Sequence, residues 1–189
     1  SADIAINSYL KSFIKKNNSS VLISTARAGN VIGGGDWSPG RLIPDCVKSW
    51  SKKNIVSVRS PNSTRPWQHV LEVINGYMTL AYNLSKNKKL HGESFNFGPN
   101  LSKRYKVIDV LKQSKVNWKS ARWKFIKKKL SFKESKLLHL NSAKAKKTLK
   151  WNNFLSFKVS IALTIDWYRK FYENKTNMYN NSKNQINYY

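Results

Sequence analysis

The feature that most constrains the fold is an uninterrupted apolar run that ends in a glycine-rich segment. Residues 21–26 (VLISTA) are β-prone throughout, and the chain continues as RAGNVIGGGDW over residues 27–37. A strand without polar alternation is typical of a parallel sheet covered on both faces. Ligands of open α/β sheets bind beyond the carboxyl ends of such strands. The sequence therefore predicts an α/β fold with a candidate ligand-binding loop at residues 27–37.

Helical and extended segments alternate along the rest of the chain. Apolar residues recur at intervals of three and four in the predicted helices, which cover residues 1–16, 42–50, 71–84, 107–111, 142–149 and 157–172. The predicted strands cover residues 55–58, 67–70, 94–97 and 123–126. The asparagine-rich tail has no periodicity. We therefore expect one folded unit over residues 1–172 and a disordered tail over residues 173–189.

The charge is strongly unbalanced. The chain has 189 residues, and its 35 Lys and Arg against 9 Asp and Glu give a formal net charge of +26. Such a field attracts nucleic acid or an anionic membrane without specificity. The lysines are spread along the whole chain, which favours compositional drift. We predict no specific nucleic-acid site, although a basic binding module remains an alternative.

Several classes of protein are excluded or disfavoured. No apolar run approaches the roughly 18 residues that span a bilayer, and the first 13 residues lack the pattern of a signal peptide. Cys46 is the only cysteine, so neither an intramolecular disulfide nor a cysteine zinc cluster can form. These observations predict a cytoplasmic protein without a membrane partner.

The glycine loop matches neither standard phosphate-binding pattern. Gly33, Gly34 and Gly35 lack the spacing of the dinucleotide fingerprint and of the P-loop. Adjacent glycines instead indicate positive φ angles and a close approach of the backbone to a ligand, or else a hinge or turn. Tyr82 and Lys86 have the Tyr-x-x-x-Lys spacing of short-chain dehydrogenases. Two common residues at one spacing arise easily by chance, so we predict no catalytic role for them.

Four motifs occur in an order that resembles a known enzyme family. They are TARAGNVIGGGDW, RLIPDCVKSW, RPWQHVLEVINGY and FNFGP. They resemble the C-terminal half of the sugar-nucleotide 4,6-dehydratases that act on CDP-glucose, within the extended short-chain dehydrogenase/reductase family. The similarity covers residues 1–170. It implies the C-terminal part of a Rossmann-like fold with a small substrate-binding α/β subdomain, and it leaves dTDP-, GDP- and UDP-sugars open as substrates.

The resemblance also implies a reaction. In this family NAD oxidises the sugar at C4, an acidic residue removes the C5 proton, water leaves from C6, and the hydride returns to C6. The ketone acidifies the neighbouring C–H bond, so the cofactor enables the elimination and is regenerated.

The residues that perform this chemistry are not expected in the matched region. The first 13 residues resemble the helix that follows the catalytic lysine of the family. The glycine fingerprint, the acid–base pair and the catalytic Tyr-x-x-x-Lys are therefore expected upstream of Ser1. We predict no catalytic residue within the chain, and no activity without an N-terminal half.

Site residues are carried over from the family motif by motif. Two are expected against the nicotinamide of NAD: Ala28 and Gly29. Seven are expected to contact the substrate: Asn30, Arg41, Leu42, Ile43, Arg59, Arg65 and Glu134. The helix of residues 1–16 matches one that commonly forms the family's dimer contact, so homodimerisation stays open.

Each implied ligand contact has a purely structural alternative. Asn30 and Arg65 are expected on the sugar diphosphate, a role that suits the planar fork of arginine, although a turn residue and a surface ion pair are the alternatives. His69 is predicted to be a packed, hydrogen-bonded histidine rather than a catalytic one. Asp36 and Trp37 are predicted to anchor the loop.

The chain also departs from the family pattern. Lys133 stands where a histidine is expected, Asn141 stands where an aspartate is expected, and the segment of residues 100–120 is shortened. These departures concern the nucleotide end of the implied pocket. The large positive charge is not explained by the resemblance either.

Overall fold

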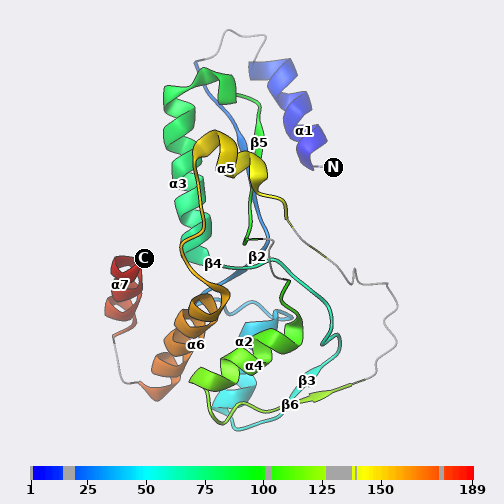
Figure 1. Cartoon of the computed structure of the whole chain (residues 1–189), viewed down its shortest axis with the longest axis vertical. Coiled ribbons are helices and arrows are strands. Elements are labelled where there is room, and N and C mark those ends of the chain that lie inside the picture. The colour runs from blue at the N-terminus through cyan, green and yellow to red at the C-terminus, as the bar shows by residue number, and fades with distance from the viewer. Residues whose placement is uncertain (1, 15–19, 101–103, 127–137, 139, 175–176) are drawn as a thin grey trace.

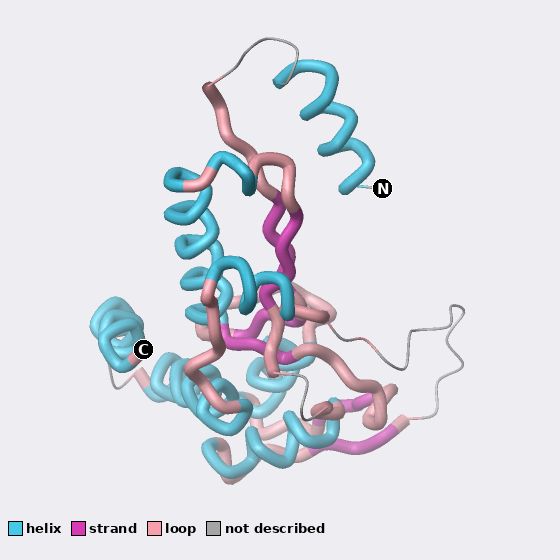
Figure 2. Tube along the Cα trace, turned by 45° about the horizontal axis from the view of Figure 1, so that its top comes forward, coloured by secondary structure: helices cyan, strands magenta, loops and turns pink. Residues whose placement is uncertain are grey.

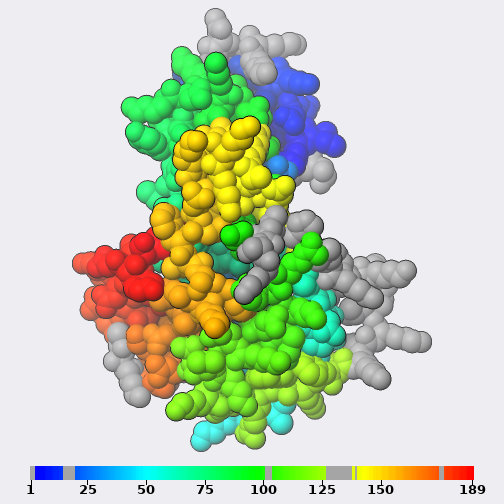
Figure 3. Space-filling view, in the orientation of Figure 1, coloured from blue at the N-terminus to red at the C-terminus, as the bar shows by residue number. Residues whose placement is uncertain are grey.

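The computed structural model describes residues 2–14, 20–100, 104–126, 138, 140–174 and 177–189. Figure 1 shows an α/β molecule with an upper and a lower lobe, and the space-filling view shows that the upper lobe is the narrower one (Figure 3). The described residues form three two-stranded parallel sheets, and the tilted view of Figure 2 shows them succeeding one another along the molecule. The predicted α/β class with parallel strands is confirmed.

The upper lobe is built on one pair of strands. β1 (Thr25–Ala28) pairs in parallel with β5 (Ser94–Phe97). The helices around this pair are α3 (Val70–Lys86) and α5 (Ala143–Leu149), while α1 (Ala2–Tyr9), continued by a π-helical turn (Leu10–Ile14), stands to one side (Figure 1). Its core consists of Leu80, Leu90, Phe95, Phe97, Ala145, Leu149 and Trp151. The packing is close, because a Cβ on Gly76 would lie 2.8 Å from Phe97 Cγ.

The lower lobe holds the larger core. β2 (Asn30–Ile32) pairs with β4 (Trp67–His69), and β3 (Val56–Val58) pairs with β6 (Trp123–Phe125). Three helices supply most of the apolar surface: α2 (Leu42–Ser51), α4 (Val107–Asn117) and α6 (Phe157–Glu173). Their fully buried side chains include Val47, Trp50, Val110, Leu111, Ile161, Ile165 and Tyr168. The core therefore fixes α2, whose first turn borders the site described below.

The strand predicted at residues 21–26 begins later than expected. Residues 21–24 have no regular secondary structure. Ile23 N–H donates to His91 Nδ1 at 3.0 Å, the Ile23 carbonyl accepts from the Gly92 amide at 2.7 Å, and Ser24 Oγ donates to Leu90 O at 2.5 Å. The ladder starts at Thr25 and continues to Ala28, and β2 follows after Gly29. Within residues 27–37, predicted as a ligand-binding loop, Arg27 and Ala28 end β1 and Asn30–Ile32 form β2. Gly29 is a bend between the two strands, and Gly34 and Gly35 form a turn.

The glycines after β2 serve packing as well as chain reversal. A Cβ on Gly34 would lie 2.6 Å from Trp167 Cδ1 and closer still to Cγ, so the loop lies directly on α6. Gly35 has a φ of +80°, which favours glycine. The sequence predicted a close approach to a ligand, whereas at Gly34 the backbone approaches a helix of the same chain.

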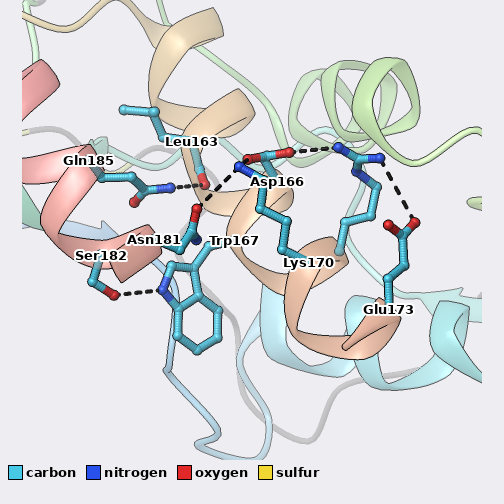
Figure 4. A network of polar contacts seen from close by, with 9 residues as sticks. Leu163, Asp166, Trp167, Lys170, Glu173, Asn181, Ser182 and Gln185 are labelled. Carbon is cyan, nitrogen blue, oxygen red and sulfur yellow. Dashed lines mark hydrogen bonds and ion pairs between the residues drawn. The ribbon is translucent and has the colours of Figure 1, made fainter. Parts of the chain in front are cut away.

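The sequence predicts a disordered tail from residue 173 onward, but the structure has a helix over most of this segment. α7 (Met178–Tyr188) begins at Asn177, whose side chain accepts hydrogen bonds from the Tyr179 and Asn180 amides. It lies beside α6 (Figures 1 and 3). The contacts between the two helices are polar (Figure 4): Trp167 Nε1 to Ser182 Oγ, Lys170 Nζ to Asn181 Oδ1, and Gln185 Nε2 to Leu163 O, at 3.0, 3.2 and 2.9 Å.

Candidate functional site

A cavity of about 370 Å³ opens where the strands of the lower lobe meet α2. Its walls come from β2, from β3 and the turn after it, from the start of β4, and from the first turns of α2 and α4. The N-cap residue of α2 is Arg41, whose side chain makes no capping hydrogen bond. The unpaired amides and the dipole of a helix N-terminus favour an anion. This end of the cavity therefore suits a negatively charged ligand.

Three arginines line the cavity, and they come from three different segments. Arg41 and Arg59 are exposed, and Arg65 is half-buried. Arg65 Nη1 donates to the Thr64 carbonyl at 2.8 Å. Among the residues that the structure describes, the acids on the wall are Asp36 and Asp45. Arginine recognises diphosphate groups through paired N–H donors, so a wall with more guanidinium than carboxylate groups fits such a ligand.

The Asp36 carboxylate is already engaged by other groups of the chain. Its Oδ2 accepts from Arg41 Nη1 at 2.9 Å, and its Oδ1 accepts from the Ser38 amide at 3.0 Å. Burial raises the pKa of Asp36, but the hydrogen bonds of Ser38 and Arg41 and the charge of Arg41 outweigh it and lower that pKa. The carboxylate is therefore ionised at neutral pH. Asp36 also anchors the loop, since its carbonyl accepts a hydrogen bond from Tyr168, as predicted.

The structure brings most of the predicted site residues together. Seven of them line this one cavity: Gly29, Asn30, Arg41, Leu42, Ile43, Arg59 and Arg65. Ala28 is the last residue of β1 and does not line it. These seven residues lie on or next to β2 and α2 and on the segments that flank β3 and β4, so the fold brings successive elements of the chain together at one cavity.

Two of the sequence predictions fall on positions that the structure does not describe. Glu134, expected to contact the ribose, and Ser1, upstream of which the catalytic Tyr-x-x-x-Lys is expected, both lie outside the described residues. The first described residue is Ala2, which begins α1. The role of Glu134 and the placing of the catalytic pair before Ser1 therefore stay predictions.

Sequence reasoning missed several wall residues. They are Val31, Ile32, Gly33, Gly40, Pro44, Asp45, Val56, Ser57, Val58, Ser60, Ser63, Trp67 and Val107. Most are backbone or apolar contributors on either side of a predicted residue. The signal that could have found the polar ones is the serine-rich turn between Arg59 and Arg65, which joins two predicted site positions.

Other titratable groups near the strands have structural roles. His69 is 1% exposed, and its Nδ1 accepts from the Leu71 amide at 3.3 Å. Burial lowers the pKa of His69 to about 4, so the ring is neutral at pH 7. The prediction of a packed, hydrogen-bonded histidine is confirmed. Burial raises the pKa of the Cys46 thiol to about 12, which leaves it unreactive.

Glu72 is a buried acceptor for a loop. One of its oxygens accepts hydrogen bonds from the Phe154 and Leu155 amides, and the other accepts one from the Tyr189 hydroxyl at 3.3 Å. Burial raises the pKa of Glu72, and these hydrogen bonds partly oppose that rise. Glu72 therefore ties α3 to the segment that precedes α6, and it does not line the arginine-lined cavity.

Tyr82 and Lys86 do not form a catalytic pair in this structure. The Tyr82 side chain is 67% exposed on α3, and Lys86 Nζ lies 6.0 Å from its ring centroid. Neither residue lines the arginine-lined cavity. Among the described residues, no three His, Cys, Asp or Glu side chains cluster in a way that would hold a metal ion. Within the same part of the chain, no helix has the length and apolarity needed to cross a membrane.

The fold is that of sugar-nucleotide epimerases and dehydratases. The UDP-glucuronic acid 4-epimerase of Bacillus cereus, solved with UDP-glucuronic acid and NAD, superposes with a TM-score of 0.70 at 20% identity, over 87% of this chain and 48% of that one. The dTDP-glucose 4,6-dehydratase of Bacillus anthracis, solved with NAD, gives 0.70 at 19% identity, over 91% of this chain and 50% of that one. The chain thus has the fold of about half of each of these two enzymes.

At the level of sequence the resemblance is more specific. The chain is 32% identical over 172 residues to the CDP-glucose 4,6-dehydratase of Salmonella typhimurium (strain LT2), and the match covers 89% of this chain. It covers 48% of that enzyme, so the chain spans about half the length of its relative. No protein-family profile matches the chain. The resemblance to the dehydratases that act on CDP-glucose is confirmed.

Proposed function

We propose that this chain is the substrate-binding half of an NAD-dependent sugar-nucleotide 4,6-dehydratase that converts CDP-glucose to CDP-4-keto-6-deoxyglucose. The observation that carries the proposal is the convergence of seven residues, implied by separate motifs, on one cavity with three arginines. The similarity to CDP-glucose 4,6-dehydratase supports CDP-glucose as the substrate. A dTDP-, GDP- or UDP-sugar is the second candidate, because a UDP-glucuronic acid 4-epimerase and a dTDP-glucose 4,6-dehydratase have the same fold.

The proposed roles follow the positions of the side chains. Arg65, half-buried two residues before β4, binds the diphosphate together with Asn30 of β2, the strand that pairs with β4. In the first turn of α2 the Leu42 and Ile43 amides are the ones presented to the nucleotide, because Pro44 has no N–H and the Asp45 amide donates to the Arg41 carbonyl. Arg59 lies at the carboxyl end of β3, where we place the base. Contact of Glu134 with the ribose remains a prediction.

NAD would supply the hydride acceptor for the reaction, but the residues present do not form a complete site for it. Gly29 lines the cavity, and a Cβ there would lie 2.5 Å from Pro66 Cγ, so packing against Pro66 requires glycine at this point. With Ala28 at the end of β1, it would provide one wall against the nicotinamide. The sequence has no dinucleotide fingerprint to hold the diphosphate of NAD.

The missing part of the NAD site points to a partner. Among the described strands, β1 pairs only with β5, so its other edge is open to a further parallel strand. We propose that an N-terminal nucleotide-binding half completes the sheet there and provides the NAD site and the catalytic groups. We expect no dehydratase turnover from the isolated chain, and measurable turnover from it with NAD and CDP-glucose would contradict this.

The experiment that tests the cavity is isothermal titration calorimetry of the folded chain with CDP, dTDP, UDP and GDP at 0.15 M salt. We expect CDP to bind most tightly and Arg65→Ala to weaken binding at least tenfold, because a charge-assisted bond to phosphate is lost. Arg27→Ala is the matched control, because Arg27 pairs with Asp3 outside the cavity. Equal affinity for all four nucleotides, or an unchanged affinity of Arg65→Ala, would reject the proposed site.

The same samples separate the alternatives. Preferential binding of dTDP or UDP would assign the cavity to another sugar nucleotide. Absence of nucleotide binding together with nucleic-acid binding that survives physiological salt would favour a basic binding module. Attraction by the net charge alone predicts nucleic-acid binding that collapses as the salt concentration rises.

A further inference from the structure

The loop between β2 and α2 holds one acidic side chain against an arginine of the cavity. Asp36 Oδ2 lies 2.9 Å from Arg41 Nη1, and both residues line the cavity. The Arg41 side chain is 58% exposed and the Asp36 side chain 27% exposed. Ion pairs with this exposure usually contribute little, because two long side chains must be ordered at once in water. The question is therefore what orders this pair.

Asp36 is fixed from sides other than that of Arg41. Its carbonyl accepts from the Tyr168 hydroxyl at 2.6 Å, and its Oδ1 accepts from the Ser38 amide. The next residue, Trp37, packs edge-on against Tyr168 with centroids 5.2 Å apart, and its carbonyl accepts from Lys48 Nζ at 2.7 Å. Contacts with α6 and α2 that do not involve Arg41 therefore order the segment that carries the Asp36 carboxylate.

Arg41 donates a hydrogen bond from its side chain to Asp36. It is the N-cap of α2 with extended backbone angles, and its side chain makes no capping hydrogen bond. A long exposed side chain at this place loses considerable rotamer freedom when it binds a ligand. A fixed carboxylate that already selects one rotamer removes part of that loss before the ligand arrives.

We propose that Asp36 is a positioning residue that acts through Arg41: it holds the guanidinium at the rim of the cavity in advance of an anionic nucleotide. The inference rests on the proposed function, because it names how one wall of the same site is prepared. It also predicts the direction in which nucleotide affinity changes when the Asp36 carboxylate is removed. Removing a carboxylate from an anion-binding site favours the ligand electrostatically, whereas removing a positioning residue disfavours it.

The test is a double-mutant cycle on CDP affinity, measured by calorimetry at 0.15 M salt. We expect Asp36→Asn to weaken CDP binding by about three- to tenfold, the cost of ordering one long side chain. In an Arg41→Ala background, the same substitution should change the affinity by less than about twofold, because the group that it positions is absent. Asp3→Asn, which removes the acid of the exposed Arg27 pair outside the cavity, is the charge-matched control.

Two outcomes would overturn the inference while the proposed function stands. One is an unchanged or tighter affinity for CDP in Asp36→Asn, which would make the carboxylate a simple repulsive charge. The other is an equal loss of affinity with and without Arg41, which would make Asp36 a support of the loop only.

A second measurement is independent of any nucleotide. The ¹⁵N–{¹H} nuclear Overhauser effect at Arg41 Nε, recorded without nucleotide, should report an ordered guanidinium in the wild type and a mobile one in Asp36→Asn. Equal mobility in both proteins overturns the inference whether or not CDP binds. A wild-type chain that shows an ordered Arg41 but binds none of the four nucleotides would reject the proposed function, and with it the nucleotide role of the pair.

Discussion

Replacement of Gly34 by alanine tests whether the glycine loop is thin because a helix lies against it. The added Cβ would lie 2.6 Å from Trp167 Cδ1 and closer to Cγ, while ordinary carbon–carbon contacts are about 3.5–4.0 Å. The ring or the loop must therefore move by roughly 1 Å or more. Trp167 is held by a hydrogen bond from Nε1 to Ser182 and by a stacked contact with Phe171, at 5.7 Å between centroids, so it has little freedom to yield.

The expected cost combines two effects. Overpacking of a well-packed site costs about 1–3 kcal/mol, and a disturbed aromatic pair costs about 0.5–1.5 kcal/mol more. We therefore expect Gly34→Ala to lower the free energy of unfolding by about 3 kcal/mol. For a chain of this size that corresponds to a fall in Tm of roughly 6–12 °C. Urea denaturation followed by tryptophan fluorescence measures the first quantity, and calorimetry measures the second.

Gly40→Ala is the matched control, because it separates steric overlap from backbone strain. Gly40 has a φ of +76°, but a Cβ there would meet nothing within 4 Å. Only the left-handed conformation is penalised, at about 1 kcal/mol. If Gly34→Ala costs less than about 0.5 kcal/mol, or no more than Gly40→Ala, the close contact with Trp167 does not explain the glycine.

Three further predictions concern stability. Burial lowers the pKa of His69 to about 4, so protonation favours the unfolded chain. The free energy of unfolding should therefore fall by about 3 kcal/mol as the pH drops from 6.5 to 4. Denaturation of His69→Gln, measured over the same pH range, should lack this fall. Phe97→Ala should cost about 3–5 kcal/mol because the ring is fully buried, while Phe154→Ala, at a ring 69% exposed, should stay within about 0.5 kcal/mol, and equal losses in urea titrations would contradict the core assignment. Removal of residues 177–189 should lower the free energy of unfolding by roughly 2–4 kcal/mol through lost hydrogen bonds to α6 and Glu72, and an unchanged midpoint would restore the prediction of a disordered tail.

Elements with an apolar stripe were predictable from the sequence. Residues 157–172 repeat apolar side chains every three or four positions, and the structure buries Ile161, Ile165 and Tyr168 of α6 completely. α7 could not be found in this way because its contacts are hydrogen bonds of Asn181, Ser182 and Gln185. Hydrophobic periodicity does not detect a helix that contacts its neighbour through polar side chains.

The site was predictable only in part, for a related reason. Motif order indicated Asn30, Arg41 and Arg65 as members of one site. The parallel pairing of β2 with β4 places Asn30 beside the segment that contains Arg65. The function of the glycines was not predictable, because nothing in RAGNVIGGGDW says that the facing surface is Trp167, more than 130 residues later. Local sequence reports which backbone angles are allowed, but not which distant side chain requires them.

The net charge and the cavity contribute to ligand binding in different ways. Most of the 35 basic residues have no acidic counterpart, since the chain has only 9 acids, and several of these are committed to named contacts, as Glu72 is to the amides before α6. The uncompensated cations create a general field that draws any anion toward the surface, and this field is screened within about 8 Å at physiological ionic strength. The Asp36–Arg41 pair and the half-buried Arg65 act at contact distance and depend on shape. Discrimination between CDP and another nucleotide therefore has to come from the cavity, and the charge of the chain as a whole determines only how readily anions arrive there.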